Sequence, residues 1–332
     1  MPTAALIGCG DISQTHFEAI AANPKIDLVA VCDTDAGRLS AAVAALDVVG
    51  FADHRHLVDE IRPDVVHICT PHHQHVPIAL DCLERGIGVI VEKPLAQNLA
   101  QGQRLVDAAK HSAAKVAVCF QNRYNATAQA MHQLLTSGEL GAVLGASATV
   151  MWHRSTEYYR ARPWRGQWET SGGGVLMTQA IHTLDLVQWL VGDITDVDGR
   201  IATHVHGEEA EVEDTAEMML THGNGASTVF YATLANVVDS PVAIEIYTEA
   251  ATLTLRGDLT VTYPDGGSYV VVEPLLQSTG RAYWGASHQL LIADFYERLN
   301  DPEPFWISPA EALKSLTVAQ RLYAATRRSA NR

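Results

Sequence analysis

The chain has 332 residues, 47% of them hydrophobic and 18% charged, a composition typical of a globular enzyme of about two domains. Its formal net charge of −15 argues against nucleic acid and anionic membrane as partners. No apolar run reaches the roughly 18 residues of a transmembrane helix. Because the first residues contain no leader and the five cysteines form no C-x-x-C pair, we expect a cytoplasmic protein with reduced thiols.

The first 120 residues alternate between strand-like and helix-like segments. Short apolar runs predict strands at 4–7, 26–33, 64–71, 88–94 and 115–120. Helical patterns follow them, beginning at Ile12 and then covering 35–47, 76–86 and 99–112. This alternation predicts an α/β fold with a doubly wound parallel sheet covered by helices on both faces.

The pattern changes after about residue 122. A helix at 127–141 leads to alternating strands at 145–153, 216–234, 243–257 and 260–273, and the last 45 residues return to helix. The sequence therefore predicts a dinucleotide-binding domain at 1–122 and a second α/β domain at 123–332 with a large open, mostly antiparallel sheet. No flexible linker separates them, so we expect the two domains to share a cleft.

The first predicted strand is followed by a glycine turn, Gly8-x-Gly10-x-x-Ser13. Gly8 would allow the tight turn, and Gly10 would let a pyrophosphate approach the backbone at the start of the next helix. The next strand ends at Asp33, whose carboxylate would bind the ribose 2′-hydroxyl and repel a 2′-phosphate. This arrangement predicts a preference for NAD over NADP, which Arg38 could soften.

Two later motifs contain residues suited to catalysis. Lys93 lies in "EKP", at the carboxyl end of a parallel strand, where ligands bind. After three glycines, Thr178, His182 and Asp185 are spaced to share one stripe of a predicted helix that ends near Gly192. His182 is either a general base facing a cleft or a buried structural histidine paired with Asp185, and both interpretations stay open.

The stretch 152–169 is rich in aromatic and arginine side chains. Aromatic faces stack on sugar rings, and arginine binds carboxylate or phosphate. The same composition is typical of a contact with a partner subunit. Tyr283 and Trp284 are further candidates to close a substrate pocket.

Two polar stretches are expected to hold no metal ion. The spacing in "PHHQH" (71–75) matches no standard zinc pattern, so we expect no metal. The acidic run 208–214 is interpreted as a solvated loop.

Together, the glycine turn, "CTPHHQH", "EKP", "QNRY", "WRG" and the "GGG…H…D" segment resemble the glucose-fructose oxidoreductase / inositol dehydrogenase / rhizopine catabolism family of dinucleotide-dependent dehydrogenases. The resemblance covers essentially the whole chain and implies a Rossmann domain followed by a domain with a large open sheet. It also implies a cis peptide at Lys93–Pro94, a lysine beside the nicotinamide at Lys93, and an acid/base at His182. Many relatives have Asp or Asn where this chain has Thr178, which cannot bear a charge at neutral pH.

The site residues expected from these motifs fall into three groups. The catalytic candidates are Lys93, His182 and Thr178. The cofactor-binding candidates are Gly8, Gly10, Asp11, Ile12, Ser13, Asp33, Arg38, Thr70, Pro71, His75, Glu92, Lys93 and Gln121. The substrate-binding candidates are Arg123, Tyr124, Trp164, Arg165, Trp168, Thr178 and His182.

These observations predict an NAD-dependent oxidoreductase that acts on a secondary alcohol or ketone of a sugar, inositol or related polyol. The alternatives are an NAD-dependent glycoside hydrolase acting through transient sugar oxidation, a catalytically silent NAD-binding regulator, and a reductase of a non-carbohydrate carbonyl. The open sheet leaves one face to cover, so we also expect a homodimer or homotetramer formed through the second domain.

Overall fold

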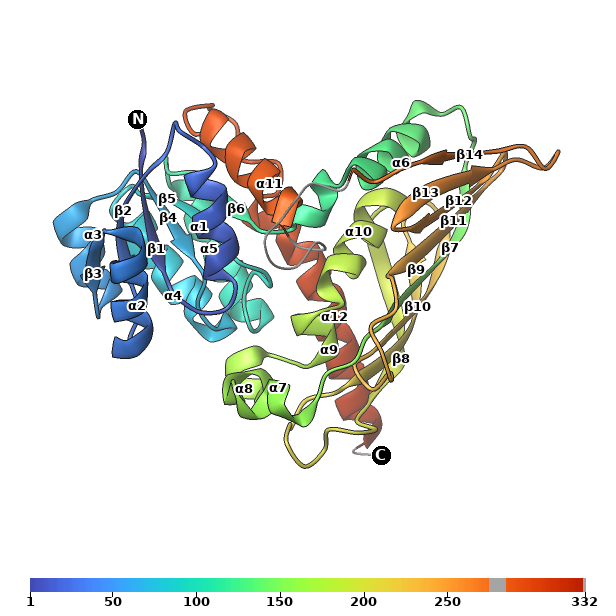
Figure 1. Cartoon of the computed structure of the whole chain (residues 1–332). Coiled ribbons are helices and arrows are strands. Elements are labelled where there is room, and N and C mark those ends of the chain that lie inside the picture. Colours follow the sequence, from blue (N-terminus) through green and yellow to red (C-terminus); the bar gives the residue numbers. More distant parts are fainter. Residues whose placement is uncertain (275–284, 331–332) are drawn as a thin grey trace. The chain divides into compact units, whose positions relative to one another are not determined.

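The computed structural model describes residues 1–274 and 285–330 (Figure 1). The chain divides into two compact units. The first consists of Met1–Gln121 with Leu276–Leu313, and the second of Asn122–Leu275 with Lys314–Arg332.

The first unit is built on a six-stranded parallel sheet with the order β3-β2-β1-β4-β5-β6. Its strands are β1 (Thr3–Ile7), β2 (Asp27–Cys32), β3 (Val49–Phe51), β4 (Val65–Ile68), β5 (Gly88–Val91) and β6 (Val116–Val118). Strand order reverses between β1 and β4, so right-handed crossovers place helices on opposite faces of the sheet. The doubly wound α/β fold expected from the sequence is confirmed.

The helices of this unit are α1 (Ser13–Ala21), α2 (Ala36–Leu46), α3 (His54–Ile61), α4 (His72–Leu83), α5 (Leu99–His111) and α11 (Gly285–Glu297). The side chains of Asp35, Asp53 and Asn98 cap α2, α3 and α5 by accepting backbone N–H bonds. Strand β3 and helix α3 are not among the elements expected from the sequence, because the three residues of β3 give too short a pattern.

Helix α11 packs against α1 in the first unit. Its residues Leu291, Ile292 and Phe295 are fully buried. The sequence analysis placed this stretch with the second domain. An amphipathic pattern shows that one helix face is buried, but it does not show which element covers that face.

The second unit contains an eight-stranded sheet with the order β14-β13-β12-β11-β7-β10-β9-β8, in which only the β7–β10 pair is parallel. Its strands are β7 (Val143–Met151), β8 (Ile194–Ala202), β9 (Thr215–His222), β10 (Ser227–Thr233), β11 (Ala243–Thr248), β12 (Thr252–Arg256), β13 (Asp258–Thr262) and β14 (Ser268–Val271). This confirms the large, mostly antiparallel sheet.

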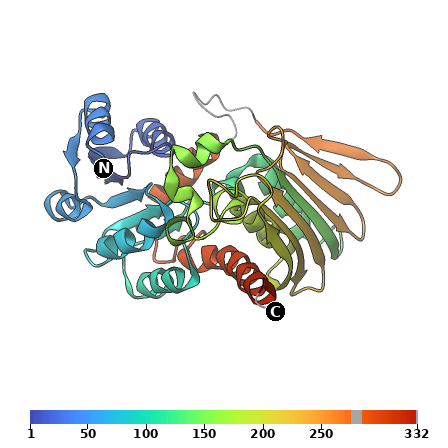
Figure 2. The ribbon, with the colours of Figure 1, turned by 90° about the horizontal axis from the view of Figure 1, so that it is seen from below.

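The main helices of the second unit are α6 (Ala126–Ser137), α10 (Ile181–Val191) and the later part of α12 (Pro309–Ala330). Short helices α7 (Thr156–Arg160), α8 (Trp168–Ser171) and α9 (Val175–Thr178) precede α10. Helix α10 contacts β7, and α6 contacts β12 and β13. Figures 1 and 2 show α10 on one face of the sheet, and within the described ranges no helix covers the other face.

The single helix expected after the three glycines is divided in two. Helix α9 ends at Thr178, and α10 begins at Ile181. Gln179, with φ −126° and ψ −58°, lies outside regular helical geometry and forms the bend. Thr178 and His182 therefore belong to different helices, contrary to the expected continuous stripe.

Candidate active site

Five loops leave the first sheet at the carboxyl ends of parallel strands, and these ends share one edge. The glycine turn follows β1, and Asp33 follows β2. Thr70 and Pro71 follow β4, Glu92 and Lys93 follow β5, and Gln121 follows β6. The topology thus places most of the expected cofactor-binding residues along one edge of the sheet.

The glycine turn packs tightly against the loop after β4. Gly8 has a φ of +96°, and a Cβ atom there would lie 2.7 Å from the carbonyl carbon of Cys69. The Ser13 hydroxyl donates to the Gly10 carbonyl oxygen at 2.6 Å, which fastens the turn to the first residue of α1. Ser13 is buried, so a small side chain suits this position.

Asp33 is buried beside the same turn. One carboxylate oxygen accepts the Cys9 N–H at 2.8 Å, and the other accepts the Asp35 N–H at 2.8 Å. Burial and the Asp33 carboxylate raise the pKa of Cys9 to about 11, with Arg38 opposing them, so this thiol stays protonated at neutral pH. Arg38 pairs with Asp35 at 3.5 Å on the exposed start of α2.

Three observations indicate that this edge of the sheet is suited to a dinucleotide. A Cβ atom at Gly10 would meet nothing within 4 Å, so the backbone there is open to a ligand. The Thr70 hydroxyl and the Gln121 side-chain oxygen are buried without a hydrogen-bond partner among the described residues. Each oxygen of Asp33 also retains a lone pair for a ribose hydroxyl.

The Lys93–Pro94 peptide is cis, as the resemblance implies. His75, on α4, holds this turn: its two ring nitrogens lie 2.8 Å from the Pro94 carbonyl oxygen and 2.9 Å from the Thr70 carbonyl oxygen. Burial lowers the pKa of His75, while the two carbonyl groups act in the opposite direction. His75 therefore links the loops after β4 and β5.

A buried hydrogen-bond network lies behind Glu92, and the sequence analysis missed it. One Glu92 oxygen lies 3.0 Å from Nε2 of His16 on α1 and 3.0 Å from Nε2 of His288 on α11. His16 continues to His67 on β4, and His67 to the Tyr296 hydroxyl on α11. The residues of this network are spread along the chain between positions 16 and 296, so no short sequence motif could have predicted that they lie together.

In the second unit, Thr178 and His182 are both buried. The Thr178 hydroxyl donates to the Gly174 carbonyl oxygen at 2.8 Å, so toward another polar group its oxygen can act only as an acceptor. This bond ties Thr178 to the glycine segment that precedes α9.

The glycine segment is held by Glu213, a residue that the sequence analysis placed in a solvated loop. Glu213 is buried, and its carboxylate accepts the N–H groups of Gly174 at 2.8 Å and Leu176 at 3.1 Å and the Tyr323 hydroxyl at 2.7 Å. The neighbouring Asp214 is also buried and accepts the N–H groups of the turn 204–206. The solvated-loop interpretation is wrong at these two positions, because both carboxylates are buried and accept backbone N–H groups of other segments.

Arg123 and Asp185 form a buried bidentate ion pair. Nε and an Nη atom of Arg123 lie 2.7 and 2.6 Å from the two Asp185 oxygens, and each side chain is 1% exposed. The guanidinium also lies 5.5 Å from the Trp189 ring centroid. Both Asp185 oxygens are thus bound to Arg123, which was expected from the sequence to bind substrate. The next residue, Tyr124, is half-buried.

The arginines and aromatic rings of 152–169 stack largely on one another. The Arg165 guanidinium lies 4.3 Å from the Tyr158 ring centroid and 5.8 Å from that of Trp164. The Trp168 N–H donates to the Glu211 carbonyl oxygen at 2.8 Å, and its ring packs against Tyr323. Trp164, Arg165 and Trp168 all remain half-buried. Tyr283 and Trp284 lie outside the described residues.

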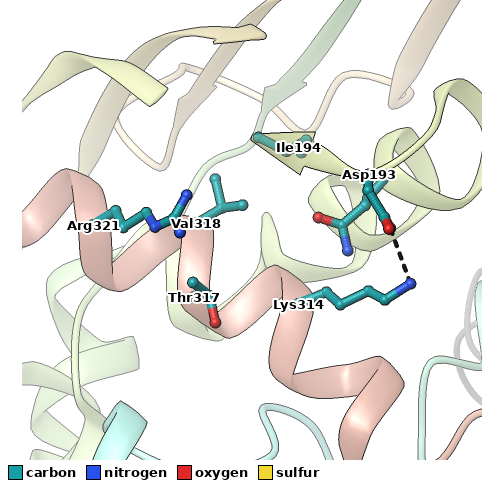
Figure 3. Close-up of a pocket in the computed structure, with 7 residues that line it drawn as sticks. Asp193, Ile194, Lys314, Thr317, Val318 and Arg321 are labelled. Carbon is teal, nitrogen blue, oxygen red and sulfur yellow. Dashed lines mark hydrogen bonds and ion pairs between the residues drawn. The ribbon is translucent and has the colours of Figure 1, made fainter. Parts of the chain in front are cut away.

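The structure contains two further features of the kind that can bind a ligand or an ion. A small pocket of about 210 Å³ in the second unit is lined partly by Asp193, Lys314 and Arg321 (Figure 3). It contains none of the expected site residues, and Lys314 pairs there with Asp193 at 2.9 Å. Within the described ranges, His16, Glu92 and His288 are the one group of three metal-ligating side chains with all ligand atoms within 4.8 Å.

Two further observations concern the oxidation state of the cysteines and the length and apolarity of the helices. All five cysteines are free. None of the described helices combines the length and apolarity needed to cross a membrane.

Two family models match the chain. Residues 3–120 match the model described as "Oxidoreductase family, NAD-binding Rossmann fold", and residues 128–254 match the "GFO/IDH/MocA C-terminal domain". These ranges fall in the two units that the structure separates.

Curated relatives include a D-apiose dehydrogenase of Paraburkholderia graminis, 27% identical over 226 residues that cover 68% of this chain and 58% of that protein. A D-glucoside 3-dehydrogenase of Escherichia coli is 30% identical over 193 residues that cover 57% of this chain and 53% of that protein. The chain thus matches little more than half the length of these relatives.

Among solved structures, the WlbA dehydrogenase of Bordetella pertussis in complex with NADH and UDP-GlcNAcA has a TM-score of 0.85 and 29% identity. The match covers 98% of this chain and 96% of that chain.

Proposed function

This chain belongs to the glucose-fructose oxidoreductase / inositol dehydrogenase / rhizopine catabolism family, and we propose that it is an NAD-dependent dehydrogenase of a secondary alcohol on a sugar or polyol ring. The observation that supports the proposal is the edge formed by the carboxyl ends of the parallel strands, which holds the open backbone at Gly10, the carboxylate of Asp33 and the Lys93 turn. Relatives named as apiose and glucoside dehydrogenases support this substrate class.

When bound, NAD would accept the hydride from the ring carbon. Lys93 would donate a hydrogen bond to the reacting oxygen and stabilise its developing negative charge. His182 would take the hydroxyl proton as general base, and Thr178 would accept a hydrogen bond from a substrate hydroxyl. Tyr124, Trp164, Arg165 and Trp168 are proposed to contact the sugar. Arg123 is proposed to act there through its ion pair with Asp185, which holds it against α10.

We further propose that NAD is preferred to NADP. A carboxylate at Asp33 favours a ribose hydroxyl and repels a 2′-phosphate, and Arg38 already pairs with Asp35. The ratio of kcat/KM for the two cofactors tests this preference, and an equal or higher value with NADP would contradict it. The five free cysteines support the cytoplasm as the working compartment.

The decisive experiment screens sugars, cyclitols and sugar nucleotides for NADH formation, and then tests Lys93→Ala and His182→Ala on the best substrate. Each variant should lose turnover by about a hundredfold or more, while the Kd for NAD changes little. If His182 is only structural, His182→Ala will lower the Tm and leave the turnover of the folded enzyme nearly normal. No NADH formation with any polyol would contradict the proposed function.

A further inference from the structure

The Glu92 network joins four separate elements of the first unit. His16 lies on α1, His67 on β4, Glu92 directly after β5, and His288 and Tyr296 on α11. The three histidines are fully buried, and Glu92 is 4% exposed. A buried polar group without a partner is costly, so every contact in the network matters for its stability.

One assignment of protons satisfies these four hydrogen bonds without a charged histidine. His16 and His288 donate from Nε2 to the same Glu92 oxygen at 3.0 Å. The free lone pair on His16 Nδ1 then accepts from His67 Nδ1 at 2.9 Å, and His67 Nε2 accepts from the Tyr296 hydroxyl at 3.0 Å. In this assignment every hydrogen bond of the chain from Tyr296 through His67 and His16 is donated in the direction of Glu92.

The electrostatics favour this assignment. Burial lowers the pKa of His16 and lowers that of His67 well below its usual value, which keeps both rings neutral. Burial by itself raises the pKa of Glu92, but the donors on His16 and His288 outweigh it and hold the carboxyl well below its usual range. In this network Glu92 is therefore a carboxylate, and His16 and His67 are neutral imidazoles.

The other oxygen of Glu92 faces the backbone of the catalytic candidate. It accepts the Lys93 N–H at 3.2 Å, directly before the cis peptide that follows Lys93. The two histidines thus fix one end of the carboxylate while its other end binds the turn that carries Lys93. A displacement of about 1 Å at a reacting group can reduce turnover by about a hundredfold.

We propose that His16 and His288 are positioning residues that lock the Glu92 carboxylate, and through it the Lys93 turn, in the geometry required for turnover. This inference rests on the proposed function of Lys93. His67 and Tyr296 extend the network and fix the proton on Nε2 of His16. Through this network, His288 and Tyr296 on α11 help to fix the geometry of the Lys93 turn.

A metal ion on the same three ligands is the rival interpretation, and it differs in a measurable way. Zinc would bind Nε2 of His16 and of His288, so neither atom could carry a proton. His16 would then have to donate from Nδ1 to His67, and the direction of the chain would reverse. Contacts of 3.0 Å are ordinary hydrogen bonds, whereas ligand atoms around tetrahedral zinc lie about 3.3 Å apart.

The first test is independent of activity. Histidine tautomers and metal content are measured on the full-length protein, by ¹⁵N NMR with single-histidine variants for assignment and by elemental analysis. We expect a proton on Nε2 of His16 and on Nδ1 of His67, and no stoichiometric metal. The reversed tautomers, or one equivalent of bound zinc, would overturn the proposal whether or not a sugar substrate has been found.

The second test uses paired variants of His288 in the enzyme with its best substrate. His288→Leu removes the donor to Glu92, whereas His288→Gln keeps an N–H near the position of Nε2. We expect His288→Leu to lower kcat by about ten- to hundredfold with KM and the Kd for NAD nearly unchanged, and His288→Gln to restore most of kcat.

His222→Leu provides the matched control. His222 is also buried and bonds the Gly192 carbonyl oxygen and the Thr228 hydroxyl, but it lies in the second unit. It should lower the Tm and leave kcat of the folded enzyme within about twofold. If His288→Leu lowers the Tm but not kcat, as His222→Leu does, the positioning role is wrong, even where Lys93→Ala abolishes turnover.

Discussion

Gly8 and Gly10 are two residues apart, yet an added methyl group would have different surroundings at each. At Gly8 it would collide with the backbone of Cys69, and the φ of +96° is strained for any other residue. At Gly10 it would meet no atom of the protein. We therefore predict different purposes for the two glycines, the first for folding and the second for ligand approach.

This difference predicts opposite phenotypes. Gly8→Ala should lower the Tm of the ligand-free protein, because backbone or loop must shift to make room. Gly10→Ala should leave that Tm nearly unchanged but raise the Kd for NAD by about tenfold or more, because the methyl group occupies the path of the pyrophosphate. Thermal unfolding and NAD titration of both variants are the measurements. A normal NAD affinity in Gly10→Ala would show that the dinucleotide does not approach this turn.

Single residues also show where sequence reasoning stops. The roles of Gly8, Gly10 and Asp33 follow from a local pattern, because the turn and its two strands are close in the sequence. The partners of Arg123 and Glu92 do not, because Asp185 and His288 lie 62 and 196 residues further along the chain. Periodicity identifies the buried face of a helix, but it does not identify the opposing charge that makes a buried ion tolerable.

At the scale of elements, strand patterns are predicted well and helix junctions are not. Burial of one face explains the alternation of apolar residues in β9 and β10, and burial of both faces explains the fully buried strands β4 and β5, which are apolar except for His67. The bend at Gln179 has no equivalent signal, because Val175–Val191 is a continuous helical pattern in the sequence. Glu213, which binds the N-terminus of α9, comes from another part of the chain and also gives no sign in this pattern.

The pKa of Glu213 leads to a prediction of how the stability of the protein depends on pH. Burial raises the pKa of Glu213 to about 7 from its usual value of 4.5, with the Tyr323 hydroxyl and the N–H groups of Gly174 and Leu176 opposing the rise. The folded state thus holds this proton more tightly than the unfolded state. Its contribution to stability is fully present below about pH 4.5 and is lost as the pH rises through about 7, a loss of about 3 kcal/mol.

The measurement compares the Tm of the wild type with that of Glu213→Gln from pH 5 to pH 8. Since the glutamine side chain of this variant cannot ionise, the wild type should lose stability relative to the variant as the pH rises. Glu208→Gln, at an exposed position in the same loop, is the control and should give a constant difference in Tm. A constant difference for Glu213→Gln as well would mean that this carboxyl does not titrate in the folded protein over this range.

At the scale of the whole molecule, the open face of the second sheet is its most distinctive surface. Met219 on β9 and Val229 on β10 lie opposite each other in register and are 47% and 54% exposed. Tyr247 on β11 lies on the same face and is 40% exposed. Apolar side chains grouped in this way are typical of a surface that a partner covers.

We therefore predict that the protein self-associates through this face, as a homodimer or homotetramer. Val229→Asp would place a charge opposite Met219 in the middle of the contact, where a buried unpaired carboxylate costs several kcal/mol. The variant should have the mass of a monomer by light scattering or sedimentation at micromolar concentration, while the wild type has a multiple of it. Val49→Asp, on the edge strand β3 of the other sheet, alters an equally exposed valine and should leave the mass unchanged. Dissociation by Val49→Asp alone would move the interface to the first unit, and a monomeric wild type would contradict self-association.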